Sequence, residues 1–271
     1  MKKYLVISLF IILLFNGCSK KDINTPNETT KSSIQKASNN SKLSTSQFNE
    51  DSDLSSFEDE FEVKKESDPL RGYNRVMTNF NDGVYHYFFL PVSNGYKQIT
   101  NNAVRESVGN FFSNLLFPVR FVNNILQGKI ENAGEELGRF LINSTLGFVG
   151  FFDPATSEFN LQEHPEDFGQ TLGYWGFGAG PHIVLPFFGP SNVRDILGKY
   201  PDSLLNPVDY YEQRDYNLLN NNFESFATKT YDKINDTALQ DRYGILKKDA
   251  IDLYPYLKKS YEQYRLQQIK E

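Results

Sequence analysis

The sequence has few residues that carry covalent or metal chemistry. Its 271 residues include one cysteine, Cys18, which excludes an intramolecular disulfide, and three histidines. The histidines, His86, His164 and His182, lack the H-E-x-x-H spacing that places two zinc ligands on one helix face. Basic residues do not exceed acidic ones, and the net charge of -6 argues against a nucleic-acid partner, because phosphate backbones bind basic surfaces. We therefore predict no metal site and no nucleic acid.

Motifs for nucleotide binding and for a nucleophilic serine are missing too. Residues 173–180 follow the glycine pattern G-x-x-G-x-G-x-G, but the dinucleotide fingerprint counted from Gly176 needs a third glycine where Pro181 stands. Neither G-x-x-x-x-G-K-[ST] nor G-x-S-x-G occurs in the chain. These absences argue against a nucleotide-binding protein and against a hydrolase with a serine elbow.

The acidic residues and histidines offer no clear acid–base pair. Glu135 and Glu136 are adjacent, so on a helix they diverge by about 100° and cannot act together. We expect Glu135 to pair with Arg139 at i,i+4, and His182, which lies among apolar residues, to be a packing residue. A Ser-His-Asp set assembled from distant residues, with His164 or His182 as the base, is the enzymatic alternative that sequence alone leaves open. We predict no catalytic residue and no cofactor.

The amino terminus has the pattern of a lipoprotein signal peptide. Two lysines precede the apolar run 4–15, which is shorter than the roughly 20 residues of a membrane-spanning helix. Gly17 and Cys18 follow at once, as at a bacterial lipoprotein cleavage site. We predict a signal peptide over 1–17 and acylation of Cys18, because several acyl chains anchor a protein more firmly than one. Ser19, in place of an aspartate, predicts sorting to the outer membrane.

Residues 18–67 are expected to form the lipid anchor and a flexible tether. This stretch is rich in small polar and charged residues and has few large apolar side chains to offset the entropy of ordering. Residues 50–68 carry nine acidic residues and two lysines, which predicts a solvated segment rather than a docking motif. Such a coil has an r.m.s. reach of roughly 35–42 Å, so a folded body can move while its lipid stays in place.

Residues 68–195 are predicted to form a mainly α body with glycine- and proline-rich connections. The helical spacing of apolar residues predicts three helices, which cover 72–92, 104–117 and 130–145. Pro91 is expected to stop the first helix and Pro118 to break the second, and Asn101 or Asn102 to cap the second. No run of alternating apolar and polar residues predicts strands.

The most apolar stretch after the signal peptide is 140–152. As a helix its thirteen residues would be about 20 Å long, too short to cross the ~30 Å hydrocarbon core of a bilayer. Two interpretations stay open: a buried core helix, or a helix that lies within one leaflet. The 23 phenylalanines, 16 tyrosines and one tryptophan favour the second, because aromatic rings prefer the membrane interface.

Residues 196–271 are more polar and are expected to complete the same domain. Amphipathic helices are predicted over 210–226 and 238–254. Pro255 is expected to separate the second of them from a charged, solvated helical end.

The order of short motifs over 68–195 resembles the VacJ/MlaA lipoproteins of Gram-negative outer membranes. The motifs that carry this resemblance are DPL at 68–70, GYNR at 72–75, NFN at 79–81, NFFSNL at 110–115, LQG at 126–128, GRF at 138–140, NSTLG at 143–147, EDFGQTLGYWG at 166–176, GP at 180–181, LP at 185–186, GPS at 189–191 and RD at 194–195. Beyond Asp195 the likeness becomes thinner.

The resemblance implies a ring of short amphipathic helices in the periplasmic leaflet of the outer membrane, with an amphipathic channel through the ring. It also implies that mislocalised phospholipid leaves the outer leaflet and passes to a soluble periplasmic carrier for retrograde transport. Family members lie beside trimeric porins, and no cofactor or catalytic residue comes with this function. The function predicted is a phospholipid conduit. The alternatives are a structural, porin-associated lipoprotein without transport activity and a membrane-surface lipase.

Candidate lipid-contact residues come from the apolar stretch 140–152 and the glycine-rich stretch 166–195. They are Phe140, Leu146, Phe148, Phe151, Phe152, Trp175 and Phe177 for acyl or leaflet contact, and Asn143 and Thr145 for polarity at the level of the headgroup. Ordinary core packing is the alternative role for each of them. The glycine-rich stretch itself is expected to be a compact, turn-rich segment at the border of a lipid path.

Overall fold

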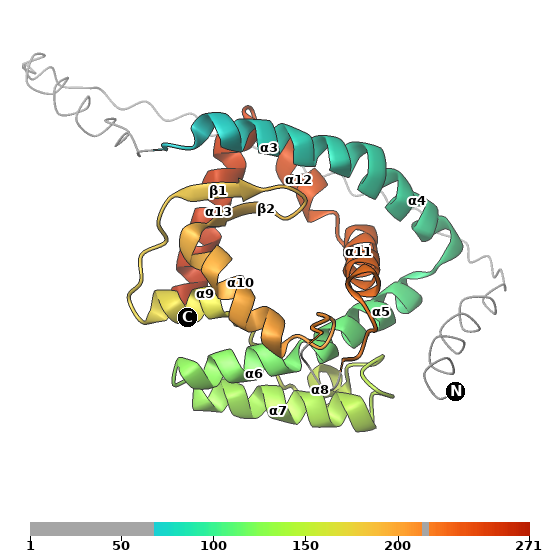
Figure 1. Cartoon of the computed structure of the whole chain (residues 1–271). Helices are drawn as coiled ribbons and strands as arrows, with labels where there is room; N and C mark the ends of the chain where they lie inside the picture. The colour runs from blue at the N-terminus through green and yellow to red at the C-terminus, as the bar shows by residue number, and fades with distance from the viewer. Residues whose placement is uncertain (1–67, 213–216) are drawn as a thin grey trace, which may run out of the picture. The chain divides into compact units, whose positions relative to one another are not determined.

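The computed structural model describes residues 68–212 and 217–271. Asp68–Glu271 is one compact unit, shown in colour in Figure 1. The signal peptide over 1–17, the acylated Cys18 and the tether over 18–67 lie outside the described residues and stay predictions.

The described unit is mainly helical, which confirms the predicted fold class. Its elements in chain order are the helices α3 (Arg71–Val84), η1 (Tyr85–Phe89, a π-helix), α4 (Leu90–Ile99), α5 (Asn102–Leu115), α6 (Phe117–Leu126), α7 (Ile130–Thr145), α8 (Pro154–Ser157) and α9 (Phe168–Tyr174), the strands β1 (His182–Leu185) and β2 (Gly189–Asn192), and the helices α10 (Val193–Leu205), α11 (Asn222–Leu239), α12 (Arg242–Lys248) and α13 (Leu253–Lys270).

The elements of this unit contact one another in a closed circuit (Figure 1). α3, η1 and α4 form one arc, and α11 packs against both α4 and α5. α5 contacts α6 and α7, α6 contacts α9 and α10, and α9 contacts α13. α13 and the β1–β2 hairpin then contact α3, where the circuit began. Figure 1 shows these elements arranged around a common centre.

Local signals predicted α5 and α7 well. The Asn101 side chain caps α5, because its Oδ1 accepts a hydrogen bond from the Val104 N–H at 2.9 Å. Val108 and Phe112 of the predicted apolar face are buried. The helix ends at Leu115, and Pro118 lies in the first turn of α6, where a missing N–H does no harm. α7 covers the predicted residues 130–145.

The prediction that Pro91 stops the first helix is wrong. The helical path continues through the π-helical turn η1 into α4, with Pro91 in the first turn of α4. The Leu90 N–H donates to the carbonyl of Tyr85, five residues back, instead of four. This wider turn reorganises the hydrogen bonds next to a residue that has no N–H to donate.

The stretch 140–152 is not a single helix, so both helical interpretations of it are wrong. α7 ends at Thr145, and Phe148 and Val149 have φ values of 52° and 61°. Gly150 follows with a φ of 89°, and a Cβ on it would lie 2.6 Å from the Asn114 side chain. Glycine fits this position because it tolerates both the left-handed conformation and the close approach.

The two helices predicted for the carboxyl-terminal part are wrong in their bounds. The helix predicted over 210–226 begins only at Asn222, after Asn221, whose side chain accepts from the Glu224 N–H at 2.9 Å. The helix predicted over 238–254 is interrupted, since α11 ends at Leu239 and α12 covers Arg242–Lys248. Pro255 lies in the first turn of α13 instead of before it, because helix starts accept proline.

Within the described residues, no helix is both long enough and apolar enough to cross a bilayer.

Candidate functional site

The glycine-rich stretch 166–195 contains a β-hairpin that the sequence did not predict. Two asparagines on one face of α3 hold its backbone. The Asn74 amide donates to the His182 carbonyl at 3.0 Å and accepts from the Val184 N–H at 2.9 Å. Asn81, two turns further along α3, bonds the carbonyl of Leu185 and the N–H of Phe187 at 2.9 and 2.7 Å. The two amides therefore act on β1 as a neighbouring strand does.

The same stretch packs α9 closely against α10. A Cβ on Gly198 would lie 2.4 Å from the backbone nitrogen of Gly169. Only glycine permits this approach, so the two helices meet backbone to backbone. α10 runs from Val193 to Leu205 and continues the glycine-rich stretch directly into the carboxyl-terminal part.

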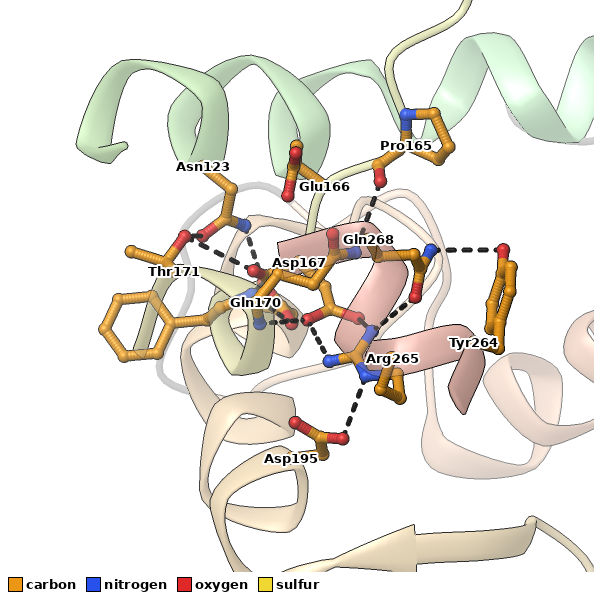
Figure 2. Close-up of polar contacts among 12 residues, drawn as sticks. Asn123, Pro165, Glu166, Asp167, Gln170, Thr171, Asp195, Tyr264, Arg265 and Gln268 are labelled. Carbon is orange, nitrogen blue, oxygen red and sulfur yellow. Dashed lines mark hydrogen bonds and ion pairs between the residues drawn. The ribbon is translucent and has the colours of Figure 1, made fainter. Parts of the chain in front are cut away.

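A buried arginine joins the carboxyl-terminal helix to this region (Figure 2). Arg265 of α13 is 7% exposed, and its guanidinium bonds both carboxylate oxygens of Asp167 at 2.8 Å. The same guanidinium donates to Asp195 at 2.9 Å. Burial raises the pKa of Asp195, but hydrogen bonds from Arg265 and Tyr261 and the charge of Arg265 outweigh it and hold this pKa below its ordinary value.

A second polar contact joins α6, α9 and α10. Asp202 accepts from the Phe168 N–H through both oxygens at 3.1 Å and from the Asn123 amide at 2.9 Å. Asn123 in turn accepts from the Thr171 hydroxyl at 2.8 Å. Burial raises the pKa of Asp202 to about 6, because these hydrogen bonds only partly offset the loss of water and Asp167 adds a nearby negative charge.

One cavity of the described unit lies between α3, η1, the hairpin, α11 and α12. Its volume is about 290 Å³. Apolar side chains make up much of its wall, among them Val84, Phe89, Val184, Phe187, Phe188 and Leu257. We call this space the apolar cavity.

The second cavity lies between α5, α6, α7 and α11 and has a volume of about 330 Å³. Its wall is mainly polar and includes Asn110, Ser113, Asn114, Arg120, Arg139 and Glu163. We call this space the polar cavity. Asp236 of α11, Gln240 of the connection after it and Arg242 of α12 line both cavities, so the two spaces share this part of their walls.

The charges of the polar cavity differ in how firmly they are held. Arg120 donates to the fully buried Glu136 at 2.8 Å and lies 3.0 Å from Glu163. Arg139 likewise bonds Asp153 at 3.1 Å. In contrast, the Arg242 Nη2 lies 3.8 Å from the nearest Asp236 oxygen. Arg120 and Arg139 therefore hold the wall together, while Arg242 keeps donors for another group.

The expected pair of Glu135 with Arg139 is wrong. Glu135 bonds the His164 ring at 3.0 Å instead, because the segment after α8 passes over α7 and brings this histidine to it. Burial and, to a smaller extent, the charge of Lys258 lower the pKa of His182 to about 4 against the weaker opposing effect of Asp68. Among the described residues, neither ring hydrogen-bonds a hydroxyl, so the geometry assembles no nucleophile around the two histidines.

The sequence profile of the MlaA lipoprotein family matches residues 66–268, which include every element described above except the last two residues of α13. The chain belongs to the MlaA lipoprotein family. The family profile therefore extends well beyond residue 195, where the recognisable motifs become thin.

Relatives and a solved structure agree with this membership. The MlaA-family chain is 40% identical over 139 residues to the intermembrane phospholipid transport system lipoprotein MlaA of Escherichia coli, covering 50% of this chain and 55% of that protein. A Rickettsia prowazekii protein is 38% identical over 152 residues, and the chain spans only 60% of its length. A solved structure described as "Structural basis for maintenance of bacterial outer membrane lipid asymmetry" is 31% identical, with a TM-score of 0.63, over 75% of this chain and 99% of that one.

The predicted lipid-contact residues fall into two groups in this MlaA-family structure. Phe140 and Asn143 line the polar cavity, where Phe140 stacks on Phe117 at 4.4 Å and Asn143 bonds Asp153 at 2.9 Å. Phe151 is half-buried and stacks on Phe111 at 5.0 Å. These three side chains already have structural partners.

The other candidates are exposed. Leu146, Phe148 and Phe152 lie at the turn after α7, with exposed fractions of 67%, 62% and 59%, and Thr145 beside them bonds back to the Leu141 carbonyl. After α9, Trp175 and Phe177 are also exposed, and the Trp175 indole donates to the Leu126 carbonyl at 3.1 Å. Lipid contact by any of these residues stays a prediction.

Sequence reasoning missed Arg265 and Arg242. A weak signal for the first exists, because Tyr254, Leu257 and Tyr261 recur at helical spacing and are followed by Arg265 on the same face. The residues beside Arg242, Asp241 and Tyr243, sit roughly where the family has an Asp-x-Tyr, but only the structure places Arg242 itself in the walls of both cavities.

Proposed function

We propose that this protein is a phospholipid conduit of the outer membrane. In this role it takes mislocalised phospholipid from the outer leaflet and passes it toward the inner membrane, which maintains the lipid asymmetry of the outer membrane. The observation that carries the proposal is the pair of neighbouring cavities within one ring of helices, one apolar and one polar, which share Asp236, Gln240 and Arg242 in their walls. A phospholipid has the same division between acyl chains and headgroup, and binding sites match their ligands in this way.

The relatives support the same role. Escherichia coli and Shigella flexneri proteins that are each 40% identical to this chain are intermembrane phospholipid transport system lipoproteins. The solved structure that resembles this one concerns outer-membrane lipid asymmetry. Such a conduit needs no catalytic group, since lipid moves without a change in covalent bonds.

The proposal places the body in the periplasmic leaflet, held by acylated Cys18. The exposed side chains Leu146, Phe148, Phe152, Trp175 and Phe177 suit contact with that leaflet, because apolar and aromatic side chains are stabilised at the bilayer boundary. A trimeric porin beside the ring and a soluble periplasmic carrier that receives the lipid complete the proposed assembly.

Deletion of the gene tests the function in cells. We expect phospholipid to accumulate in the outer leaflet and the cells to become sensitive to detergent, and the wild-type gene to reverse both effects. A clean deletion with a normal outer leaflet contradicts the conduit. If porin assembly fails while lipid asymmetry is retained, the protein is instead a structural, porin-associated lipoprotein.

A further inference from the structure

The charges that line the polar cavity balance. Three guanidinium groups, those of Arg120, Arg139 and Arg242, face three carboxylates, those of Asp153, Glu163 and Asp236. In addition, Arg120 donates a hydrogen bond to the fully buried Glu136, which does not line the cavity. The cavity therefore presents no excess positive charge, which a headgroup with a net negative charge would require.

Two of these charged groups keep unused hydrogen-bonding capacity and lie on different elements. The Arg242 side chain is 70% exposed, with its Nε bonded to Gln240 at 3.2 Å and its Nη2 3.8 Å from Asp236. Ser113 and Arg120 both contact Oε1 of Glu163, and among the described residues no partner occupies its Oε2. The cavity thus offers an open cation and, on a different element, an open anion in Glu163, while the carboxylate beside Arg242, that of Asp236, also accepts from Lys233 at 3.4 Å.

We propose that the polar cavity binds the zwitterionic headgroup of a phospholipid, with Arg242 donating to the phosphate and Glu163 accepting from the amine. Arg242 also lines the apolar cavity, which is where the phosphate of a lipid must lie if its acyl chains occupy that space. A guanidinium suits this position because its donors match phosphate oxygens. The inference rests on the proposed function, since it assigns a headgroup class to the same path.

The test compares two lipids that share acyl chains and differ in the headgroup. Full-length protein in detergent is incubated with phosphatidylethanolamine or phosphatidylglycerol that carries a photoreactive group on one acyl chain, and the crosslinked fraction is measured by mass spectrometry. We expect about tenfold more capture of phosphatidylethanolamine, since one charge-assisted hydrogen bond is worth about a factor of ten. Glycerophosphoethanolamine, which has no acyl chains, should compete at least tenfold more weakly than the whole lipid; equal competition overturns the role of the apolar cavity.

Three variants separate the two contacts. Arg242→Gln should reduce the capture of both lipids about tenfold, because both carry the phosphate. Glu163→Gln should lower the capture of phosphatidylethanolamine to the level seen for phosphatidylglycerol. The capture of phosphatidylglycerol should not change. Arg71→Gln is the matched control, because Arg71 is exposed and lines neither cavity. This substitution should not change the capture of either lipid.

The outcomes distinguish the inference from the function on which it rests. Equal capture of both lipids by the wild type, or unchanged capture and preference in both cavity variants, overturns the headgroup assignment and leaves the conduit standing. If the wild type captures neither lipid, the proposed function and the inference fail together. Circular dichroism is the check on folding, and we expect folded variants because both substituted side chains are partly exposed.

Discussion

The guanidinium of Arg265 bonds both carboxylate oxygens of Asp167 at 2.8 Å, across 98 residues of sequence. The Asp167 side chain also caps α9 by accepting from the Gln170 N–H at 2.8 Å. One pair of residues thus fixes the start of α9 and the end of α13 together, and so helps to close the ring.

Arg265→Leu should therefore destabilise the fold. The substitution leaves Asp195 buried without one of its partners, and a broken buried ion pair costs about 3–5 kcal/mol. Urea unfolding followed by circular dichroism measures the change. Lys259→Leu on the same helix is the control, because Lys259 is exposed, and it should change the free energy of unfolding by less than about 0.5 kcal/mol. Equal effects of the two substitutions contradict a structural role for the Arg265 pairs.

The hairpin should depend on Asn74. Asn74→Ala leaves the His182 carbonyl and the Val184 N–H without the amide that bonds both, at a cost of about 2–4 kcal/mol for two buried groups. Hydrogen exchange of the Val184 amide reports this directly and should become faster. Asn79→Ala, an exposed position on the same helix, provides the control and should leave that exchange rate unchanged. Slow exchange of the Val184 amide in the Asn74 variant argues that the hairpin forms without the hydrogen bonds of the Asn74 side chain.

Asp202 should make the fold less stable as the pH rises. Its pKa is raised from 3.8 to about 6 in the folded chain, so the folded state binds this proton more tightly than the unfolded state. The resulting stabilisation is complete below about pH 3.8 and is lost as the pH passes 6, by at most about 3 kcal/mol. His182, whose pKa is lowered to about 4, has the opposite effect between pH 4.5 and 7, so the loss is measured in thermal melts as the difference in slope between the wild type and Asp202→Asn.

A matched pair of variants assigns that pH dependence. Burial and the charge of Asp236 raise the pKa of Asp232 to about 6 as well, so Asp202→Asn should remove one destabilising contribution to the slope, and the double variant with Asp232→Asn a second. Asp195, whose pKa is held below its ordinary value, titrates outside this window. The same slope in the wild type and the double variant rules out both carboxylates as contributors.

Trp175 should lie at the membrane interface. It is the only tryptophan in the chain and its side chain is 47% exposed, so its fluorescence reports this position alone. In vesicles, lipids brominated near the headgroup should quench its emission more strongly than iodide in the water. Phe177→Ser beside it should weaken this quenching, while Phe223→Ser, an exposed aromatic outside the predicted set, should not. Strong quenching by iodide and none by brominated lipid contradicts the proposed leaflet contact.

Helix starts and stops that depend on nearby residues could be predicted from the sequence. The cap at Asn101, the end of α5 before Pro118 and the bounds of α7 all follow from side chains within a few positions. Pro91 misled the prediction because the wider π-helical turn before it supplies another hydrogen-bonding route. The expectation that proline ends a helix holds for regular α-helical hydrogen bonding and does not cover a π-helical turn.

Long-range contacts explain what the sequence did not show. The four-residue strand β1 holds its place because Asn74 and Asn81 bond it from more than 100 residues away. The charged final helix looked solvated, but its Arg265 finds buried carboxylates in a distant segment. The candidate site was only partly predictable for the same reason: Phe140 and Asn143 line the polar cavity, whereas only the structure places Arg242 in its wall.

Transfer of phospholipid through the reconstituted protein tests the central claim most directly. Vesicles that carry the full-length protein are loaded with labelled phospholipid, and its appearance on a soluble acceptor protein is followed over time. Val84→Trp fills part of the apolar cavity and should slow transfer at least tenfold, while Val76→Trp, on an exposed position of the same helix, should not. Transfer at the wild-type rate in a folded Val84→Trp variant, or no transfer by the wild type, contradicts a conduit through this ring.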